Sequence, residues 1–161
     1  MIPNTARTHL LSGIPGNISH DGPTRAGSAI IDSASVLNNV FGRALTYKDQ
    51  SVETVQAGGT GVFAGILINP NLYAVDNPYA PNASAVEFLS MGEVYVELGS
   101  AGQIGDQVSF DPATGIISAG TDGTVIPGAH IARHLPSAET PRLAVIALNG
   151  IVSLPESGGG E

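Results

Sequence analysis

The chain contains no cysteine and no tryptophan, and only 12% of its 161 residues are charged. Without cysteine it can form neither disulfides nor thiolate metal sites, so its stability must come from core packing, supplemented by any self-association. An average soluble domain has about 25% charged residues, which keep its surface hydrated. A surface this poor in charge favours a protein that packs against other protein.

Basic residues are especially scarce, with six against 14 acidic ones and a formal net charge of −8. Residues 1–48 hold four basic and two acidic residues, whereas residues 49–161 hold two basic and twelve acidic ones. Nucleic-acid binding needs clustered lysine and arginine, so we expect no direct nucleic-acid partner. A mildly basic N-terminal segment on an acidic body is typical of an arm that docks on an acidic neighbour.

Long apolar runs are absent too, and none approaches the roughly 20 residues that a membrane-spanning helix needs. The first residues also lack the charged and apolar regions of a signal peptide. We therefore expect no membrane partner, and synthesis in the cytoplasm.

What the chain does contain is glycine and proline, 21 and 11 residues, which favour turns and short strands over helices. Val94, Val96 and Leu98 alternate with polar neighbours, as in a strand with one buried face. The run 62–68 is almost wholly apolar, as in a strand buried on both faces. Residues 106–118 predict a hairpin whose turn contains proline and glycine. About ten such short strands predict a single all-β domain, a β-barrel or β-sandwich.

Three segments follow from this pattern. Residues 1–28 contain many glycines and prolines, which predicts an extended N-terminal arm. Residues 29–154 are expected to form the β-rich body, and residues 155–161 a Gly-rich C-terminal tail. The stretch 72–84 predicts a long loop. Residues 33–41 fit either helical turns or a strand, and the sequence does not decide between them.

The sequence contains no recognisable catalytic or metal-binding pattern. The glycines at 58, 59 and 61 lack the spacing of a phosphate loop and precede a strand rather than a helix. The pairs His130 with His134 and Glu93 with Glu97 are four residues apart, which in a strand is about 13 Å. That separation is too long for a shared ion or a hydrolytic carboxylate pair. We expect no cofactor, no metal and no enzyme activity.

Several motifs resemble those of the structural cement proteins, the head decoration proteins of tailed bacteriophages. The resemblance covers roughly residues 13–150. Its more specific pieces are the segment 61–70 with Tyr73 and the hairpin that begins at Gly105. Weaker pieces also match, at residues 15–23, 41–45, 92–96 and 144–149.

The resemblance implies a non-catalytic protein on the outer surface of the capsid, made in the bacterial host cytoplasm. Its partners would be the major capsid protein and further copies of itself, with a homotrimer favoured and a dimer as the second possibility. It would bridge neighbouring capsomers and so stabilise the shell. In the arm, the residues expected to meet the capsid protein are Arg7, Leu10, Leu11 and Arg25. In the long loop, Tyr73 and Tyr79 are the expected oligomer or capsid contacts.

Two other classes share the same strand pattern. A β-rich phage tail module, or one that binds a receptor or carbohydrate, is disfavoured by the absence of tryptophan and by an aromatic content of only 5%. A small β-barrel hydrolase is third, because a dispersed Ser–His–Asp triad leaves no sequence signature.

Overall fold

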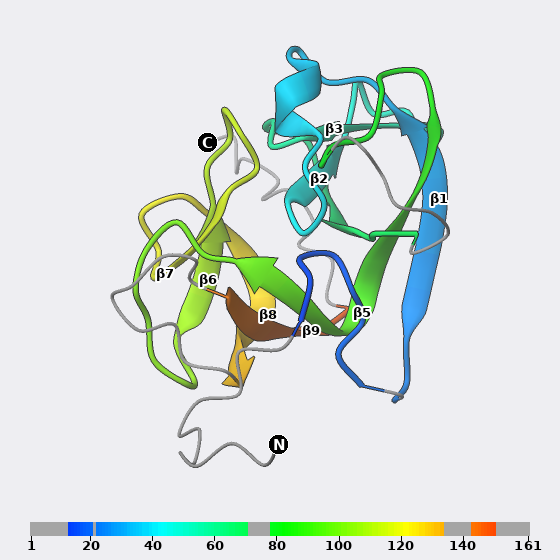
Figure 1. Ribbon diagram of the computed structural model, residues 1–161. Helices are drawn as coiled ribbons and strands as arrows, with labels where there is room; N and C mark the ends of the chain where they lie inside the picture. Colours follow the sequence, from blue (N-terminus) through cyan, green and yellow to red (C-terminus); the bar gives the residue numbers. More distant parts are fainter. Residues whose placement is uncertain (1–12, 21, 71–77, 134–142, 151–161) are drawn as a thin grey trace, which may run out of the picture.

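The computed structural model describes residues 13–20, 22–70, 78–133 and 143–150 (Figure 1). In these ranges the regular structure is nine β-strands and one short 3-10 turn, η1, which confirms the all-β prediction. The elements are β1 (Arg25–Ile31), η1 (Val36–Asn38), β2 (Ala44–Tyr47), β3 (Thr54–Ala57), β4 (Phe63–Leu67), β5 (Ala85–Glu97), β6 (Gln107–Phe110), β7 (Ile117–Ala119), β8 (Thr124–Arg133) and β9 (Leu143–Asn149).

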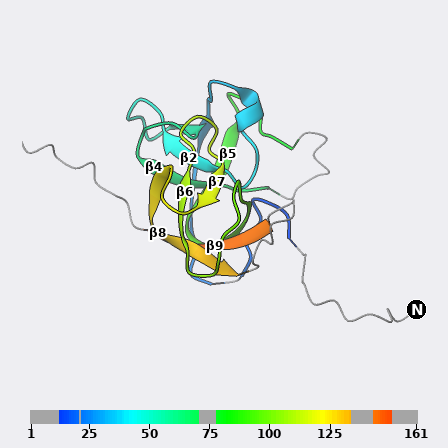
Figure 2. The same cartoon turned by 90° about the vertical axis from the view of Figure 1, so that its left-hand side faces the viewer.

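The strands form one sheet in the order β1-β3-β2-β4-β5-β9-β8-β6-β7, and β1 also pairs with β5. This extra pairing closes β1, β3, β2, β4 and β5 into a five-stranded barrel. Only the β1–β3 contact is parallel among the paired strands. Figure 1 shows β6, β7, β8 and β9 gathered beside this barrel, and Figure 2 shows the same arrangement from the side.

The long strand β5 belongs to both halves of the molecule. Its residues Ala85–Met91 pair with β1, and its residues Met91–Glu97 pair with β9. The change of partner falls next to Gly92, whose φ of +128° suits glycine. One continuous strand therefore ties the barrel to the β6–β9 half.

Two apolar clusters form the core, one among the barrel strands and one that packs β6–β9 against Ala44, Ile66 and Leu89 of the barrel strands. The barrel encloses fully buried Ile31, Leu45 and Leu67, whereas Val94, Phe110 and Ile146 are buried in the second cluster. Burying each such side chain contributes roughly 1.5–3 kcal/mol. The predicted alternation is confirmed, since Val94, Val96 and Leu98 are all buried. The same holds for the apolar run, in which Ala64–Leu67 are buried on both faces of β4.

The turn of the predicted β6–β7 hairpin locks the two halves together. Gly59 N donates to the Pro112 carbonyl at 2.6 Å and Ala44 N donates to that of Gly115 at 2.9 Å. A Cβ on Gly58, whose φ is +71°, would lie 2.5 Å from the Pro112 oxygen. The Asp111 carboxylate accepts from the Thr114 hydroxyl and the Ala113 N–H, and these bonds lower its pKa. The glycine-rich stretch at 58–61 thus serves the docking of a hairpin.

The structure decides the ambiguity at residues 33–41 in favour of a single 3-10 turn, followed by an isolated bridge between Val40 and Tyr79. β1 begins at Arg25, so the last four residues of the expected arm are strand residues of the barrel. β5 also begins earlier than the alternation that starts at Val94 indicated, at Ala85.

Candidate functional site

For a protein expected to bind other protein, the candidate site is a surface. Of the residues predicted to contact partners, Arg7, Leu10, Leu11 and Tyr73 lie outside the described residues. Arg25 is exposed at the first position of β1, and Tyr79 is half-buried in the loop before β5. The structure therefore locates two of the six residues, and these two lie on different segments.

The first feature is the N-terminal segment, defined as residues 13–20, which lies along β5. Gly16 N donates to the Tyr95 carbonyl at 2.8 Å, Tyr95 N donates to that of Asn17 at 2.9 Å, and Ser19 N to that of Glu93 at 2.9 Å. Gly16 has a φ of +87°, and a Cβ there would lie 2.8 Å from Asn69 N. The base of the expected arm is thus fixed to the body by backbone bonds and close packing.

The N-terminal segment nevertheless presents apolar side chains to solvent. Ile14 is 54% exposed and Ile18 is 41% exposed. A β-branched apolar residue gains nothing from such exposure in an isolated molecule, whereas burial against a partner would remove its surface from water. These two residues could not be identified from the sequence, because their exposure depends on how the segment docks on β5.

A charged group holds the end of the N-terminal segment. Arg133 from β8 makes a two-pronged ion pair with Glu93 from β5, with Nε to Oε2 at 2.9 Å and Nη2 to Oε1 at 3.2 Å. The same guanidinium donates from Nη1 to His20 Nε2 at 3.3 Å. Because arginine only donates, His20 Nε2 is the acceptor here. An exposed pair of this kind contributes about 0–1 kcal/mol, so its role is to position the segment.

The second feature is an apolar groove beside Tyr79, with a volume of about 540 Å³. Phe41, Ile68, Pro70 and Pro81 share its wall with Tyr79. The other lining residues are Ser28 of β1, Ala80, Ser84 and Ala85–Glu87 of β5. We call this surface the Tyr79 groove. It is of the size at which pockets bury substantial apolar surface, and only one of these lining side chains is charged.

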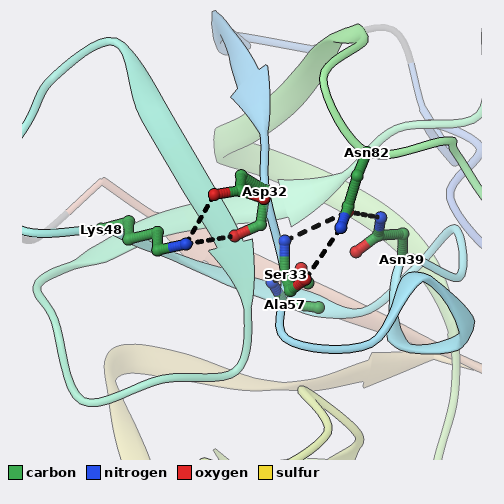
Figure 3. Close-up of polar contacts among 6 residues, drawn as sticks. All are labelled: Asp32, Ser33, Asn39, Lys48, Ala57 and Asn82. Atoms are coloured by element: carbon green, nitrogen blue, oxygen red, sulfur yellow. Dashed lines mark hydrogen bonds and ion pairs between the residues drawn. The ribbon is translucent and has the colours of Figure 1, made fainter.

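A buried polar network fixes the loop that carries Tyr79 (Figure 3). Asn39 is completely buried, and its Nδ2 donates to the Ala80 carbonyl at 2.9 Å and to Asn82 Oδ1 at 2.7 Å. Asn82 also accepts from Ser33 N at 3.1 Å and donates to the Ser33 carbonyl at 2.8 Å. The Ser33 hydroxyl accepts from Ala57 N at 2.8 Å. The network thus joins the loop to β3 and to the segment after β1.

The third feature is the distribution of basic side chains. Arg43 donates to the Thr114 carbonyl at 3.2 Å, and its burial lowers its pKa. Lys48 Nζ lies 2.6 Å from Asp32 Oδ2, a hydrogen bond that raises the pKa of Lys48 (Figure 3). Arg133 is paired with Glu93. Arg25, in contrast, makes no ion pair or side-chain hydrogen bond that the structure records with another described residue.

Over the described ranges, no group of three or more His, Cys, Asp or Glu side chains could hold a metal ion. His134 lies outside those ranges, so the His130–His134 pair is not described. Within the same residues, no helix has the length and hydropathy to span a bilayer.

A β-barrel with a fixed N-terminal segment and an apolar groove defines a binding scaffold, and comparison with known proteins gives its family. The family model described as structural cement protein (E217 gp24/Pam3 gp6) matches residues 2–149. The chain therefore belongs to the phage structural cement protein family. No curated protein sequence matches it.

Two solved phage structures contain chains that are similar to this one in fold. A chain of the capsid of Myoviridae phage XM1 matches with a TM-score of 0.64 at 12% identity, over 92% of this chain and 98% of that one. The head fiber gp8.5 N base of bacteriophage phi29 matches with a TM-score of 0.44 at 14% identity, over 83% of this chain and 100% of that one. Family membership supports a structural, virion-associated role in the capsid and implies that the role is non-enzymatic.

Proposed function

We propose that this chain is a decoration protein on the outer surface of the phage head, where it bridges neighbouring major-capsid-protein capsomers. Family membership supports the capsid role. The observation that carries the finer proposal is the N-terminal segment, which is fixed to β5 by backbone bonds yet exposes Ile14 and Ile18. A segment held in this way presents these two apolar side chains in a defined direction.

The N-terminal segment leads directly into residues 1–12, which include three of the expected capsid contacts. Arg7 would contribute a charge to the capsid contact, and Leu10 and Leu11, which closely precede Ile14 in the sequence, would contribute apolar surface. In this proposal residues 1–12 cross to a neighbouring capsomer while the barrel rests on another. Arg25, which has no charged partner among the described residues, adds a contact at the start of β1.

The Tyr79 groove is the second proposed contact surface. Its wall is mostly apolar, and the buried network around Asn39 holds the loop in place before any partner binds. Such preorganisation lowers the entropy that binding must overcome. Tyr79 supplies a large aromatic ring with a polar end, and Tyr73 belongs to the same loop region in the sequence.

Self-association would multiply these contacts. We propose a homotrimer, with a dimer as the second possibility, because symmetric copies on a shell make many modest contacts act together. The 12% charged residues of the sequence agree with a surface that other subunits cover. Each interface would need to bury more than about 1,000 Å² in total to be stable.

Replacing Tyr79 by alanine tests the groove. We expect Tyr79→Ala to bind purified heads that lack this protein at least about tenfold more weakly, as loss of an aromatic anchor does. Co-sedimentation with the heads measures the affinity, and sedimentation velocity of the free protein separates a capsid contact from an oligomer contact.

Leu37→Ala is the matched control, since Leu37 is an apolar residue that is 62% exposed and does not line the groove. It should bind as the unaltered protein does. If Tyr79→Ala bound as tightly and kept the same oligomeric state, the groove would not be a contact surface.

A further inference from the structure

Strand β1 has a backbone edge that β3 covers only in part. β3 pairs with the last two residues of β1, whereas β5 covers the opposite side from Arg25 to Ile30. Ile30 N donates to the Glu53 carbonyl, on the side away from β5. Because the N–H and C=O groups alternate in direction along a strand, those of Ala26 and Ser28 face this same side. Among the strands that the structure describes, none pairs with β1 there, and such an edge can accept an added strand.

The barrel opens beside this edge in an apolar pocket of about 250 Å³, which we call the barrel mouth. Its wall includes Phe63, Phe88 and Tyr47, whose ring meets that of Phe88 edge-on at a centroid distance of 6.1 Å. Gly27 lies directly over the Phe88 ring, since a Cβ there would be 2.5 Å from Phe88 Cζ. An apolar side chain that entered beside Gly27 would therefore remove aromatic surface from water.

A single charged residue stands at the rim of the barrel mouth. Of the described residues that line it, only Arg25 is charged, and this side chain is exposed. The guanidinium lies beside Gly150, where an added Cβ would be 3.4 Å from Arg25 Nη1. In the part of the chain that the structure describes, no carboxylate forms an ion pair with it. A carboxylate on an added strand would complement this charge, because opposite charges on adjacent strands attract each other.

The spacing along β1 defines the segment that fits. Arg25 and Gly27 both line the barrel mouth and are two positions apart, as residues on one side of a strand are. Their neighbours on an added strand would also be two positions apart. The edge therefore fits an extended segment with an acidic side chain beside Arg25 and an apolar side chain beside Gly27, whichever way the segment runs.

The length of the edge distinguishes between two occupants. A second copy that paired its own β1 antiparallel would reach only from Ala26 to Ser28, because β3 occupies Ile30. That contact falls far short of the roughly 1,000 Å² that a stable interface between two free proteins needs. A segment of a partner that other contacts already hold needs less area, because tethering raises its effective concentration. Ser28 also lines the Tyr79 groove, so the edge is continuous with a proposed contact surface.

We propose that the β1 edge binds an extended acidic segment of the major capsid protein as an added strand. The segment pairs with the backbone of Ala26 and Ser28, places a carboxylate beside Arg25 and fills the barrel mouth with an apolar side chain. This inference rests on the proposed capsid role, and it adds the chemistry of the capsid segment that the protein recognises.

Proline at Ser28 tests the backbone pairing. The Ser28 N–H faces away from β5, so Ser28→Pro removes a donor from the edge without removing a bond to β5. We expect Ser28→Pro to bind heads that lack this protein at least about tenfold more weakly than Ser28→Ala, which keeps the N–H. Co-sedimentation measures the affinity, and the unfolding midpoint verifies that both variants are folded. Equal binding by the two folded variants would overturn the proposal.

Reversing the charge of Arg25 tests the acidic side chain. At low salt we expect Arg25→Glu to bind the same heads at least about tenfold more weakly than Arg25→Lys, which keeps the positive charge. The difference should narrow as the salt concentration rises, because salt screens exposed charges. Equal affinities, or a difference that salt does not change, would contradict an ion pair at this position.

Amide hydrogen exchange tests whether the edge becomes covered, and it needs no variant. We expect the Ser28 N–H to exchange rapidly in the free protein and at least about tenfold more slowly on heads. Slow exchange in the free protein, or equal rates free and bound, would overturn the proposal. Protection that appeared without heads and grew with protein concentration would assign the edge to a second copy and overturn it too. If the protein failed to bind heads at all, the proposed function would also fail, whereas head binding that left Ser28 unprotected would contradict only the added strand.

Discussion

Replacing Asn39 by aspartate should destabilise the protein by at least about 3 kcal/mol at neutral pH, because it buries a charge without donors. The Asn39 side chain is completely buried and faces two acceptors, the Ala80 carbonyl and Asn82 Oδ1. A carboxylate there would lose both bonds and meet two oxygen atoms. Urea unfolding followed by circular dichroism measures the loss.

The same variant should recover stability in acid. Burial and the facing oxygens would raise the pKa of the new carboxyl in the folded state above its unfolded value of about 3.9. The part of the penalty that comes from the charge is therefore present in full well above the folded pKa and disappears as pH falls below the unfolded one. Relative to the unaltered protein, the difference in free energy of unfolding should shrink steadily as pH falls towards about 3.

Asn38→Asp is the matched control one position away. Asn38 is only half-buried, and its Oδ1 already accepts from Arg43 Nη1 at 3.4 Å. Its Nδ2 donates to the Ala113 carbonyl at 3.0 Å, but this bond is exposed, so water can replace the lost donor. A negative charge there faces a cation, so we expect a change within about 1 kcal/mol. If Asn39→Asp were equally mild, or if its penalty did not depend on pH, the network would not anchor the Tyr79 loop as described.

Removing residues 1–12 should lower the affinity for heads at least about 100-fold while leaving the barrel folded. The N-terminal segment and all nine strands remain in this variant, so the unfolding midpoint should shift by less than about 4 °C. The loss would come from Arg7, Leu10 and Leu11 together, and their contributions would be measured by co-sedimentation with heads that lack the protein.

The structure is the reason for ending this truncation at residue 12. Removing residues 1–28 would also delete the start of β1 and the bonds from Gly16, Asn17 and Ser19 to β5, so a loss of binding could reflect unfolding. Removing residues 155–161 is the control for shortening the chain and should leave binding unchanged. Full binding without residues 1–12 would show that they make no capsid contact.

The sequence predicted the parts of the fold that depend on local pattern. The alternation from Val94 to Leu98 and the apolar run at 62–68 identify buried strands because side-chain direction in a strand has a period of two. The hairpin of β6 and β7 follows from the turn residues between Asp111 and Gly115. The first half of β5 could not be predicted as a strand from the alternation, because Phe88 and Leu89 are adjacent and both buried.

Barrel closure and the interaction surfaces could not be predicted in the same way. Closure depends on β1 pairing with both β3 and β5, contacts between segments far apart in the sequence. Asn39 carries no sequence signal, because its partners Ala80 and Asn82 are about 40 positions away. Arg25 falls within the predicted arm because glycine and proline surround it in the sequence, whereas in the structure it begins strand β1 of the barrel.

The most direct test of the account is the number of copies of this chain per major capsid protein in purified virions, measured by quantitative gel densitometry. A shell-wide decoration protein must be present at a ratio near one, or at a fixed large fraction of it, as symmetry requires. That is the result we expect. A few copies per particle would contradict a shell-wide role and favour a tail module, and absence from the virion would contradict the capsid role itself.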